Sequence, residues 1–345
     1  MRVGVNPTKN SKNQELDYYH QVIIPIYIPE EEGYFEDNFT ILTYCIDSLL
    51  TTAHDKTYIT LVNNGSCKKV QVYLDELLEA GSVQEVIHSH NIGKINAIFK
   101  GVVGHNFPLI TIADADVLFL NRWQQASYDV FKAFPRTGFV STTPNPKLYK
   151  YHTFPIVFKY LFSKKLRFER SGNSEALTAF AKSIGNPSFF TNSHLEKVLT
   201  ITDNNCKAVL GAGHFVATYR GAILKQVANQ YSNYKLGAKA VRVFLDKPAA
   251  NMGYWRLATY DNYTYHLGNK IESWMVKKIE NIKKSKDIPE PTPLVATTLS
   301  PSTVTKMKRL FIEKLVFSSF LLPFLLKYKG LKKNEVKNYL ARIND

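Results

Sequence analysis

The sequence predicts an α/β protein: a doubly wound sheet with flanking helices, followed by a basic, amphipathic helical tail. Over the first 120 residues, short apolar runs alternate with segments of helical spacing, which is typical of a parallel sheet wound with helices. The net charge is +15, and residues 276–345 hold fifteen Lys and Arg against six Asp and Glu, so the basic excess is concentrated at the C-terminal end. A hydrophobic content of 45% over 345 residues is enough for one large domain with an appendage or for two ordinary domains.

The strands are predicted from short runs rich in β-branched and aromatic residues, and the helices from apolar residues three or four positions apart. Phe39, Leu42 and Ile46 have this helical spacing, and Gly81 is typical of the position after a helix end. The predicted elements, in chain order, are a strand over 22–28, a helix over 39–53, a strand over 57–66, a helix over 68–81, a strand over 83–90, a helix over 93–103 and a strand over 109–120.

The chain beyond residue 145 is less regular. Residues 145–210 mix basic and aromatic residues, and 208–224 is predicted to be a strand whose glycines permit the close approach of a ligand or another backbone. Residues 243–269 bring an Asp, a Trp, an Arg and a His close together in sequence. The stretch 285–305 is rich in Pro, Ser and Thr, a composition typical of a linker.

Asp114 and Asp116 interrupt the last of the predicted strands, LITIADADVLFL. In an extended strand, residues i and i+2 point to the same side, so the two carboxylates should face one place and favour a cation. The alternative is a solvated pair at the strand end that caps the next turn. In a doubly wound sheet, ligands bind beyond the carboxyl ends of the strands. The polar strand ends in IYIP, NNGS, SHN and DAD should therefore gather at one edge, which favours the cation site.

The three cysteines, Cys45, Cys67 and Cys206, have no paired spacing. They indicate neither a disulfide framework nor a zinc site, and they suggest a reducing, cytosolic setting. The N-terminal residues lack the apolar segment of a secretory signal.

Six segments, in order and across roughly residues 20–270, resemble those of bacterial family 2 glycosyltransferases, which have the GT-A fold. IPIYIP is similar to the strand that cradles the nucleotide base, VNNGS to the Val-Asp-Asp-Gly-Ser segment that contacts base and ribose, and NIGKINAIFKGV to the Asn-x-Gly segment. ADAD is similar to the metal-binding Asp-x-Asp motif, LDKPAANMGYWRLAT to the acidic acceptor motif, and YHLGN to the late His-x-Gly-Asn segment. The chain departs from the family at Asn63 and Asn64, which stand where the family has aspartates. The resemblance implies uracil as the base. Another base is the alternative, because the amide of an asparagine can donate a hydrogen bond as well as accept one, whereas an ionised aspartate only accepts.

The resemblance implies a mixed GT-A sheet and a catalytic domain over 1–284, with a nucleotide-sugar half at about 20–145 and an acceptor half at about 146–275. It also implies a metal-dependent, inverting transfer from a nucleotide-diphosphate sugar, with UDP as the expected nucleotide. The expected donor-binding residues are Pro25, Ile26, Tyr27, Asn63, Asn64, Lys94, Asp114, Ala115, Asp116 and Arg256.

The implied cofactor is Mn²⁺ or Mg²⁺, because a divalent cation offsets the charge that grows on the leaving diphosphate. Asp114, Asp116 and His266 are the expected ligands, with Asp116 on the metal and Asp114 on the ribose or a metal-bound water. For His266 a structural role is the alternative. Solvation is the alternative for Lys94, and pairing with an acid is the alternative for Arg256.

An inverting transfer needs a base that takes the proton of the acceptor hydroxyl. Asp246 stands at the position of the family's catalytic acidic residue; the alternative is a helix N-cap, because DKPAA is a typical helix start. His214 and Trp255 are expected to contact the acceptor, and His214 can equally be a core histidine.

Residues 306–333 mix Lys and Arg with Leu, Phe and Ile, and Glu313, Lys314 and Pro323 interrupt the apolar residues. The segment is therefore too short to span a bilayer. The prediction is a basic tail over 306–345 that lies on an anionic membrane surface, with a helix packed on the catalytic domain as the alternative. Nucleic acid is disfavoured as a partner, since it does not require such an apolar run. The whole chain is then a cytoplasmic enzyme, peripheral on the inner face of the plasma membrane, that glycosylates a lipid-linked or cell-envelope glycan.

Two other functions are disfavoured. A sugar-phosphate nucleotidyltransferase of the same fold needs a Gly-rich, basic loop after the first strand, where this chain has the acidic IPIYIPEEEGYFED. A non-catalytic, membrane-bound protein that binds nucleotide sugars or glycans would not require Asp114, Asp116 and Asp246, all of which are present.

Overall fold

A computed structural model describes residues 4–6, 8–9, 17–203, 205–284, 294 and 303–341, with side chains described from 310 onward in the last range. The predicted linker over 285–305 lies almost entirely outside these residues. The strands are β1 (His20–Ile26), β2 (Thr57–Asn64), β3 (Glu85–Ser89), β4 (Leu109–Ala113), β5 (Val117–Phe119), β6 (Thr137–Ser141), β7 (Leu166–Arg170), β8 (Lys197–Asp203), β9 (Cys206–Val209), β10 (Val216–Arg220), β11 (Trp255–Thr259) and β12 (Thr264–His266).

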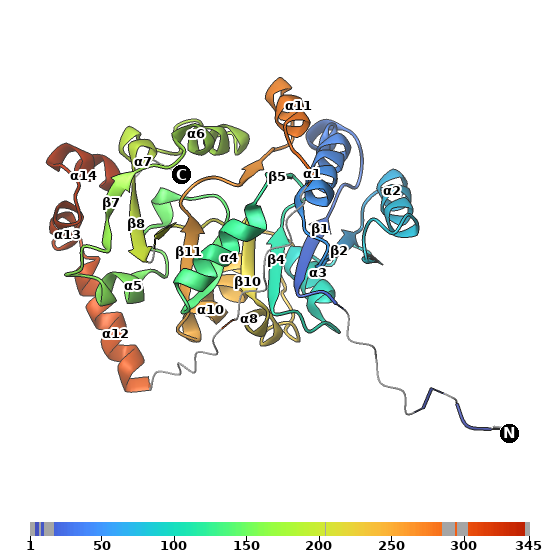
Figure 1. Ribbon diagram of the computed structural model, residues 1–345, viewed down its shortest axis with the longest axis horizontal. Helices are drawn as coiled ribbons and strands as arrows, with labels where there is room; N and C mark the ends of the chain where they lie inside the picture. Colours follow the sequence, from blue (N-terminus) through green and yellow to red (C-terminus); the bar gives the residue numbers. More distant parts are fainter. Residues whose placement is uncertain are drawn as a thin grey trace.

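Ten of these strands form one mixed sheet in the order β3-β2-β1-β4-β10-β6-β11-β9-β8-β7, and β12 pairs with β5 in a second, two-stranded sheet (Figure 1). The helices before the C-terminal region are η1 (Gly33–Phe35), α1 (Asn38–Thr52), α2 (Lys68–Glu79), α3 (Lys94–Val102), α4 (Trp123–Ala133), η2 (Pro146–Leu148), α5 (Phe154–Lys159), α6 (Ser174–Ser183), α7 (Asn192–Glu196), α8 (Gly221–Lys225), α9 (Ala238–Val241), η3 (Arg242–Asp246), α10 (Lys247–Asn251) and α11 (Ser273–Glu280).

The first part of the chain builds the parallel side of the sheet. β1 pairs in parallel with β2 and with β4, and β2 pairs in parallel with β3. Successive residues of β1 are buried on opposite faces: Val22 and Ile24 belong to the core cluster that contains α1, and Ile23 belongs to the cluster that contains α3. The predicted α/β sheet with helices on both faces is therefore confirmed.

The predicted strand over 109–120 is wrong in one respect, because it divides at the two aspartates. β4 ends at Ala113, and β5 leaves the main sheet to pair with β12. Between them, the Asp114 N–H donates to the Phe215 carbonyl at 2.7 Å, and the Asp116 carbonyl accepts from the Leu267 N–H at 2.7 Å. The carboxylates thus lie in a turn, where their side chains are about one quarter exposed, at 25% and 27%.

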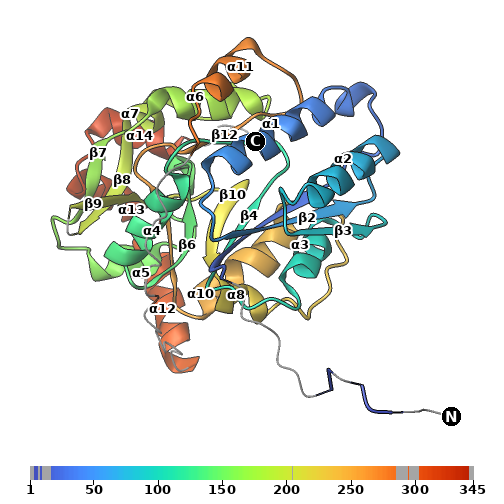
Figure 2. The same ribbon diagram turned by 45° about the vertical axis from the view of Figure 1, so that its right-hand side comes forward.

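The later strands complete the sheet out of sequence order. β10 lies antiparallel between β4 and β6 (Figure 2). β11 runs parallel to β6 on the other side of that strand. β9, β8 and β7 add an antiparallel edge. The strand predicted over 208–224 is also interrupted, since β9 ends at Val209 and β10 begins only at Val216. The loop between them contains Gly211, whose φ of 143° and contact with the Asn145 carbonyl leave no room for a Cβ atom.

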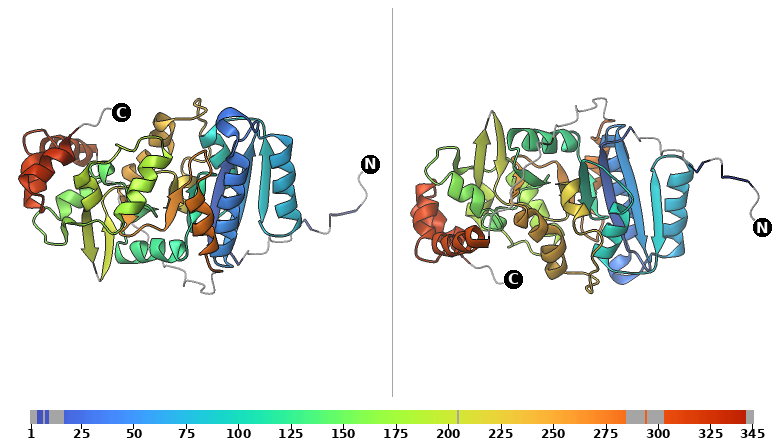
Figure 3. Two further views of the ribbon diagram at one scale, coloured as in Figure 1. Left: turned by 90° about the horizontal axis from the view of Figure 1, so that it is seen from above. Right: turned by 90° about the horizontal axis from the view of Figure 1, so that it is seen from below.

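The C-terminal region is not a detached tail. α12 (Thr303–Val316), α13 (Leu322–Tyr328) and α14 (Lys333–Leu340) follow one another along the β7 edge, at the end of the molecule opposite α2 (Figure 3). The Phe168 N–H in β7 donates to the Lys329 carbonyl at 2.7 Å. Five buried side chains of this region share a core cluster with β7 and β8: Leu322, Leu326, Leu331, Val336 and Tyr339. For residues 322–340 the structure therefore supports the alternative, in which the segment packs on the domain that precedes it.

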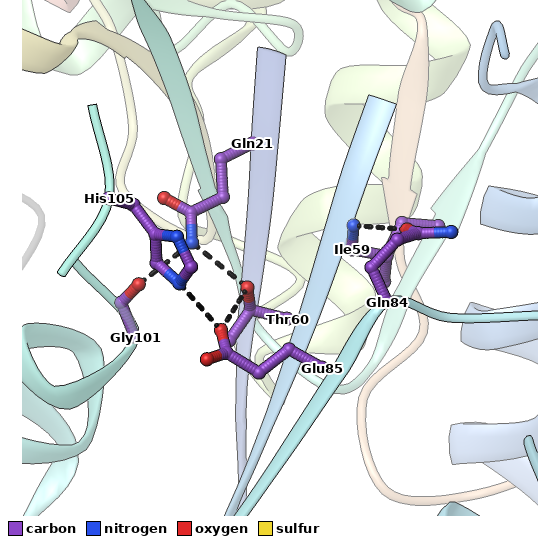
Figure 4. Close-up of polar contacts among 7 residues, drawn as sticks. All are labelled: Gln21, Ile59, Thr60, Gln84, Glu85, Gly101 and His105. Atoms are coloured by element: carbon purple, nitrogen blue, oxygen red, sulfur yellow. Dashed lines mark hydrogen bonds and ion pairs between the residues drawn. The ribbon is translucent and has the colours of Figure 1, made fainter. Parts of the chain in front are cut away.

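A polar cluster inside the parallel side fixes the position of α3 (Figure 4). The Gln21 amide donates to the Thr60 hydroxyl at 2.9 Å and to the Gly101 carbonyl at 2.7 Å. The Glu85 carboxylate accepts from Thr60 and lies 2.9 Å from His105 Nε2. β1, β2 and β3 are thereby joined to the C-terminal end of α3, whose other end carries Lys94.

Candidate active site

A cavity of about 530 Å³ opens at the carboxyl ends of β1, β2 and β4. It contains eight of the ten predicted donor-binding residues: Pro25, Ile26, Tyr27, Asn64, Lys94, Asp114, Ala115 and Asp116. Its other lining residues are Ile28, Tyr34, Phe35, Asn38, Ile41, Asn91, Lys235 and Leu236. A cavity of about 670 Å³ beside α6 and α7 is larger, but none of the predicted site residues lines it.

The cavity opens because β1 separates from β4 before it separates from β2. Pairing of β1 with β4 stops at Ile23 and Ile112, whereas pairing with β2 continues to Ile26 and Asn63. Pro25 lies in the part of β1 that pairs with β2 but no longer with β4, and it has no backbone N–H to donate.

One wall of the cavity is aromatic. The rings of Tyr27 and Phe35 meet edge to face at 6.0 Å, and Tyr34 meets Phe35 at 5.1 Å. Tyr27 and Tyr34 are 41% and 68% exposed, so their rings are available to a ligand. Tyr34 and Phe35 occur within an acidic loop segment, so no pattern in the sequence marks them as part of a site.

The two asparagines of VNNGS have different places. Asn63 is 1% exposed, its Oδ1 accepts from the Ser66 N–H at 2.9 Å, and its Nδ2 lies 2.9 Å from His88 Nδ1. Its amide therefore closes the turn after β2, and it does not line the cavity. Asn64 does line it, and its Oδ1 accepts from the Ile92 N–H at 2.9 Å, which positions the loop before α3.

Lys94 forms an ion pair with Asp114 at the mouth of the cavity. Lys94 begins α3, and its N–H donates to the Lys235 carbonyl at 2.8 Å. Gly93 has a φ of 88°, and a Cβ there would lie 2.8 Å from the Tyr234 carbonyl oxygen. The start of α3 and the segment around Lys235 are thus held together across the cavity.

Asp116 and His266 form the second polar pair of the cavity. His266 Nε2 lies 3.3 Å from Asp116 Oδ2, and its Nδ1 lies 3.0 Å from the Ser183 hydroxyl. Burial raises the pKa of Asp116, and His266 opposes this shift. Asp116 Oδ1 is buried and has no hydrogen-bond partner.

These two residues fit a divalent cation. An unpartnered carboxylate oxygen beside an imidazole nitrogen is a donor set that Mn²⁺ accepts, and Mg²⁺ also takes carboxylate oxygens. Asp114, the third expected ligand, turns instead toward Lys94. Accordingly, the described residues contain no group of three His, Cys, Asp or Glu side chains arranged to hold a metal.

Asp246 lies at the centre of a buried cluster. Its Oδ1 lies 2.5 Å from Arg256 Nη1, and its Oδ2 accepts from the Tyr151 hydroxyl at 2.9 Å. Burial raises the pKa of Asp246 to about 6, and the Arg256 guanidinium opposes the shift. The helix-cap alternative is not supported, because Asp246 occupies the N-cap position of α10 without a side-chain capping bond.

His214 lies against this cluster, and the residue after it, Phe215, accepts from the N–H of the cavity residue Asp114 at 2.7 Å. His214 Nδ1 is 3.3 Å from Asp246 Oδ1. Burial lowers the pKa of His214 to about 3, and the positive charges of Arg256 and Lys94 add to the effect. The His214–Phe215 segment therefore contacts both the buried cluster and a residue of the cavity.

Arg256 and Trp255 do not lie where the sequence predicts. Arg256 is 1% exposed, its Nη2 donates to the Ala212 carbonyl at 3.1 Å, and its guanidinium lies 4.3 Å from the Phe139 ring centre. It therefore pairs with an acid, the alternative for this residue, and does not line the donor cavity. Trp255 points to the opposite face of β11, where it meets Tyr160 at 6.0 Å in the core, so it is not part of the site.

No protein-family model and no curated protein matches this chain. Solved structures do resemble it. The mannosyltransferase PcManGT from Pyrobaculum calidifontis, in complex with GDP-Man and Mn²⁺, is 14% identical, with a TM-score of 0.45 over 93% of this chain and 73% of that one. TarS of S. aureus in complex with UDP-GlcNAc is 10% identical, with a TM-score of 0.43 over 94% of this chain and 70% of that one. At such identities and TM-scores, the donor and acceptor of this chain must be inferred from its own residues.

Proposed function

We propose that this protein is a metal-dependent glycosyltransferase that transfers a sugar from a nucleotide-diphosphate sugar to a glycan acceptor. The observation that carries the proposal is the convergence at one cavity of an aromatic wall, the Lys94 ammonium and the Asp116–His266 pair. An aromatic surface suits a base, a cation suits a diphosphate, and a carboxylate–imidazole pair suits the metal that such donors carry. Membership of bacterial family 2 remains a prediction.

The donor is proposed to lie with its base against Tyr27, Tyr34 and Asn64 and its diphosphate near Lys94. Asp114, released when Lys94 turns to phosphate, is then free to accept from a ribose hydroxyl. UDP is the first candidate for the nucleotide.

Asp116 and His266 are the residues that would hold Mn²⁺ or Mg²⁺. Such a cation, when bound, would neutralise negative charge on the leaving diphosphate. The transfer is proposed to be inverting, with Asp246 and the imidazole against it as the group that receives the acceptor proton.

The acceptor is proposed to be a lipid-linked or cell-envelope glycan, because one face of the molecule suits an anionic membrane. Within the described residues, no helix is both long and apolar enough to cross a bilayer. Phe317 of the α12–α13 connection packs on Phe154 of α5 at 5.8 Å, so two distant segments share this face. Lys329 Nζ also donates to the Tyr160 and Ser163 carbonyls, at 2.9 and 3.1 Å. We call α5, the segment after it, α12 and α13 the aromatic face, because their exposed large apolar side chains are Phe158, Phe162, Leu310, Phe311, Leu315, Phe320, Phe324 and Tyr328.

The aromatic face is also basic. Lys159, Lys164 and Lys327 are exposed on it, and neither 154–166 nor 314–334 contains an acidic residue. Apolar side chains among lysines are the composition of surfaces that enter the interface of an anionic bilayer. A peripheral position on the cytoplasmic, inner face of the plasma membrane is therefore proposed.

The test is a panel of nucleotide sugars with Mn²⁺, in which donor binding is measured by calorimetry and turnover by released nucleotide. The wild-type protein should bind and consume at least one donor, and Asp116→Ala should lose the metal-dependent part of binding. Asp17→Ala is the matched control, since that aspartate is exposed, pairs with Lys56 and does not line the cavity. Binding without turnover would favour a non-catalytic binding protein, and binding that ignores both metal and Asp116 would contradict the metal site.

A further inference from the structure

Asp246 is enclosed too completely to meet an acceptor. Its side chain is 1% exposed. Arg256 and His214 lie against Oδ1, and Tyr151 donates to Oδ2. A general base must come within hydrogen-bond reach of the hydroxyl whose proton it takes, and neither oxygen of Asp246 offers such a position.

His214 has the access that Asp246 lacks. Its side chain is 31% exposed. Nδ1 is the ring nitrogen that faces Asp246, which leaves Nε2 for a second partner. The residue after His214, Phe215, accepts from the N–H of Asp114 at 2.7 Å, and Asp114 lines the cavity, so His214 stands beside the place proposed for the sugar.

The loop that carries His214 is held on both sides. The Asn145 N–H donates to the Gly211 carbonyl at 2.9 Å, and Ala212 forms a β-bridge with Pro144. Gly211 packs so closely on the Asn145 carbonyl that a Cβ would lie 2.2 Å from its oxygen. This fixed loop and the ion pair beneath it would keep the imidazole in one orientation.

We propose that His214 is the catalytic base and that Asp246 is a positioning residue that acts through it. This inference rests on the proposed function. The acceptor hydroxyl gives its proton to Nε2 of His214 while its oxygen forms a bond with the anomeric carbon. The bond from that carbon to the diphosphate oxygen breaks, and its electron pair leaves with the diphosphate.

The surrounding charges suit this division of roles. Burial and the neighbouring cations lower the pKa of His214, which keeps the imidazole in the neutral form that can accept a proton but also makes it a weaker base. The proton can therefore be taken only with the help of a neighbouring negative charge. The Asp246 carboxylate can then accept from Nδ1–H and stabilise the imidazolium that forms, a division of roles known from histidine–aspartate pairs in hydrolases. Arg256 holds that carboxylate in place and favours its ionised form.

The experiment compares wild type, His214→Gln and Asp246→Asn, with a nucleotide sugar and Mn²⁺. Water is one acceptor and azide, an anion that carries no proton to remove, is the other. His214→Gln should reduce donor hydrolysis by roughly 10²–10⁴-fold, keep donor binding by calorimetry, and keep most of the azide reaction. Asp246→Asn should lose hydrolysis as well, and the double variant should lose little more than either single one, because the two residues act as a unit.

His105→Gln is the matched control, because it removes a histidine from the opposite end of the sheet, where Gln can still donate to Glu85. It should leave hydrolysis unchanged. If His214→Gln hydrolyses donor like wild type while Asp246→Asn does not, Asp246 is the base and the inference is wrong. Equal loss of the azide and water reactions would assign His214 a structural role. A wild-type protein that consumes no donor would overturn the proposed function itself, and the inference with it.

Discussion

The two ion pairs of the site differ in how far the protein encloses them. On the proposed donor side, the side chains of Lys94 and Asp114 are 23% and 25% exposed, whereas on the proposed acceptor side those of Arg256 and Asp246 are 2% and 1% exposed. Water screens an exposed pair, so its partners can be exchanged at little cost. A buried pair cannot lose one member without leaving an unpaired charge in an apolar surrounding. The donor side is therefore suited to change partners when a ligand binds, and the acceptor side is fixed beforehand.

The largest effect is expected from breaking the enclosed pair. Arg256→Met should lower the free energy of unfolding by about 3–5 kcal/mol, because it leaves the Asp246 carboxylate buried without its cation. Arg256 opposes the upward shift of the Asp246 pKa, so its removal should raise that pKa further. A carboxyl group whose folded-state pKa is raised favours the folded state at low pH, so the defect should be smaller in acid than in alkali.

Urea unfolding at several pH values measures this effect. The double variant Arg256→Met/Asp246→Asn should recover part of the loss, since it removes both charges. A single variant as stable as wild type would show that the cluster is open to water, and the contrast with the donor side would disappear.

Breaking the exposed pair should affect binding rather than stability. Lys94→Met should weaken donor binding by roughly 10–100-fold, about 1.5–3 kcal/mol, because a charge-assisted contact with phosphate is lost. Its unfolding free energy should stay near the wild-type value. Calorimetry with the donor and urea unfolding separate the two quantities, and Lys100→Met, an exposed lysine of the same helix, is the control. Unchanged affinity would remove Lys94 from the donor site.

A third prediction concerns a closed cluster within the donor half. His54 is 4% exposed, its Nε2 lies 2.9 Å from the Tyr128 hydroxyl, and burial lowers its pKa to about 4. A histidine with a lowered folded-state pKa contributes stability above its ordinary value of 6.5 and loses it as the pH falls toward 4. Between pH 7 and pH 5 this loss should amount to about 2 kcal/mol. Unfolding curves of His54→Gln should show a correspondingly smaller dependence on pH, and an unchanged slope would assign the acid sensitivity elsewhere.

The smallest effects are expected on the aromatic face, which lies away from both pairs. Phe158→Ser/Phe162→Ser should weaken binding to vesicles that contain phosphatidylglycerol, and each lysine replaced there should cost about 1 kcal/mol of binding, less as salt rises. Val103→Ser, at a valine that is 61% exposed on another part of the surface, is the control. Point variants are needed because a truncation before α12 would also remove buried side chains of α13 and α14. Full-length protein that ignores anionic vesicles would contradict the membrane assignment.

The grouping of residues at the cavity was predictable because these residues follow parallel strands. The ends of such strands meet at one edge whatever their order in the sheet, so Tyr27, Asn64 and Asp116 could be grouped without knowing the pairing. Residues that are merely close in sequence cannot be grouped in this way. Trp255 and Arg256 are adjacent, yet neighbours on a strand point to opposite faces, and only the pairing of β11 decides which face the site occupies.

The sequence could not decide two further points for a related reason: that LITIADADVLFL divides into two strands, and that residues 322–340 pack on the sheet edge. A buried apolar run does not reveal whether it continues in one sheet or passes to a second, because both bury it equally. Likewise, Leu322, Leu326 and Val336 are equally apolar against a membrane and against β7. Lys235 was missed because its position depends on a contact with α3 that has no signal in its own segment.

The place of β10 also bears on how the chain reaches its folded state. Thr111 and Thr218, whose hydroxyls lie 2.7 Å apart on neighbouring strands, are 107 residues apart in sequence. During synthesis, β4 therefore emerges with one edge open and stays so until β10 has left the ribosome. Open strand edges are templates for aggregation, and contacts between distant residues form slowly. A fragment ending near residue 145 would contain most of the donor pocket but not its partner strand, so the two functional halves are expected to fold as one cooperative unit.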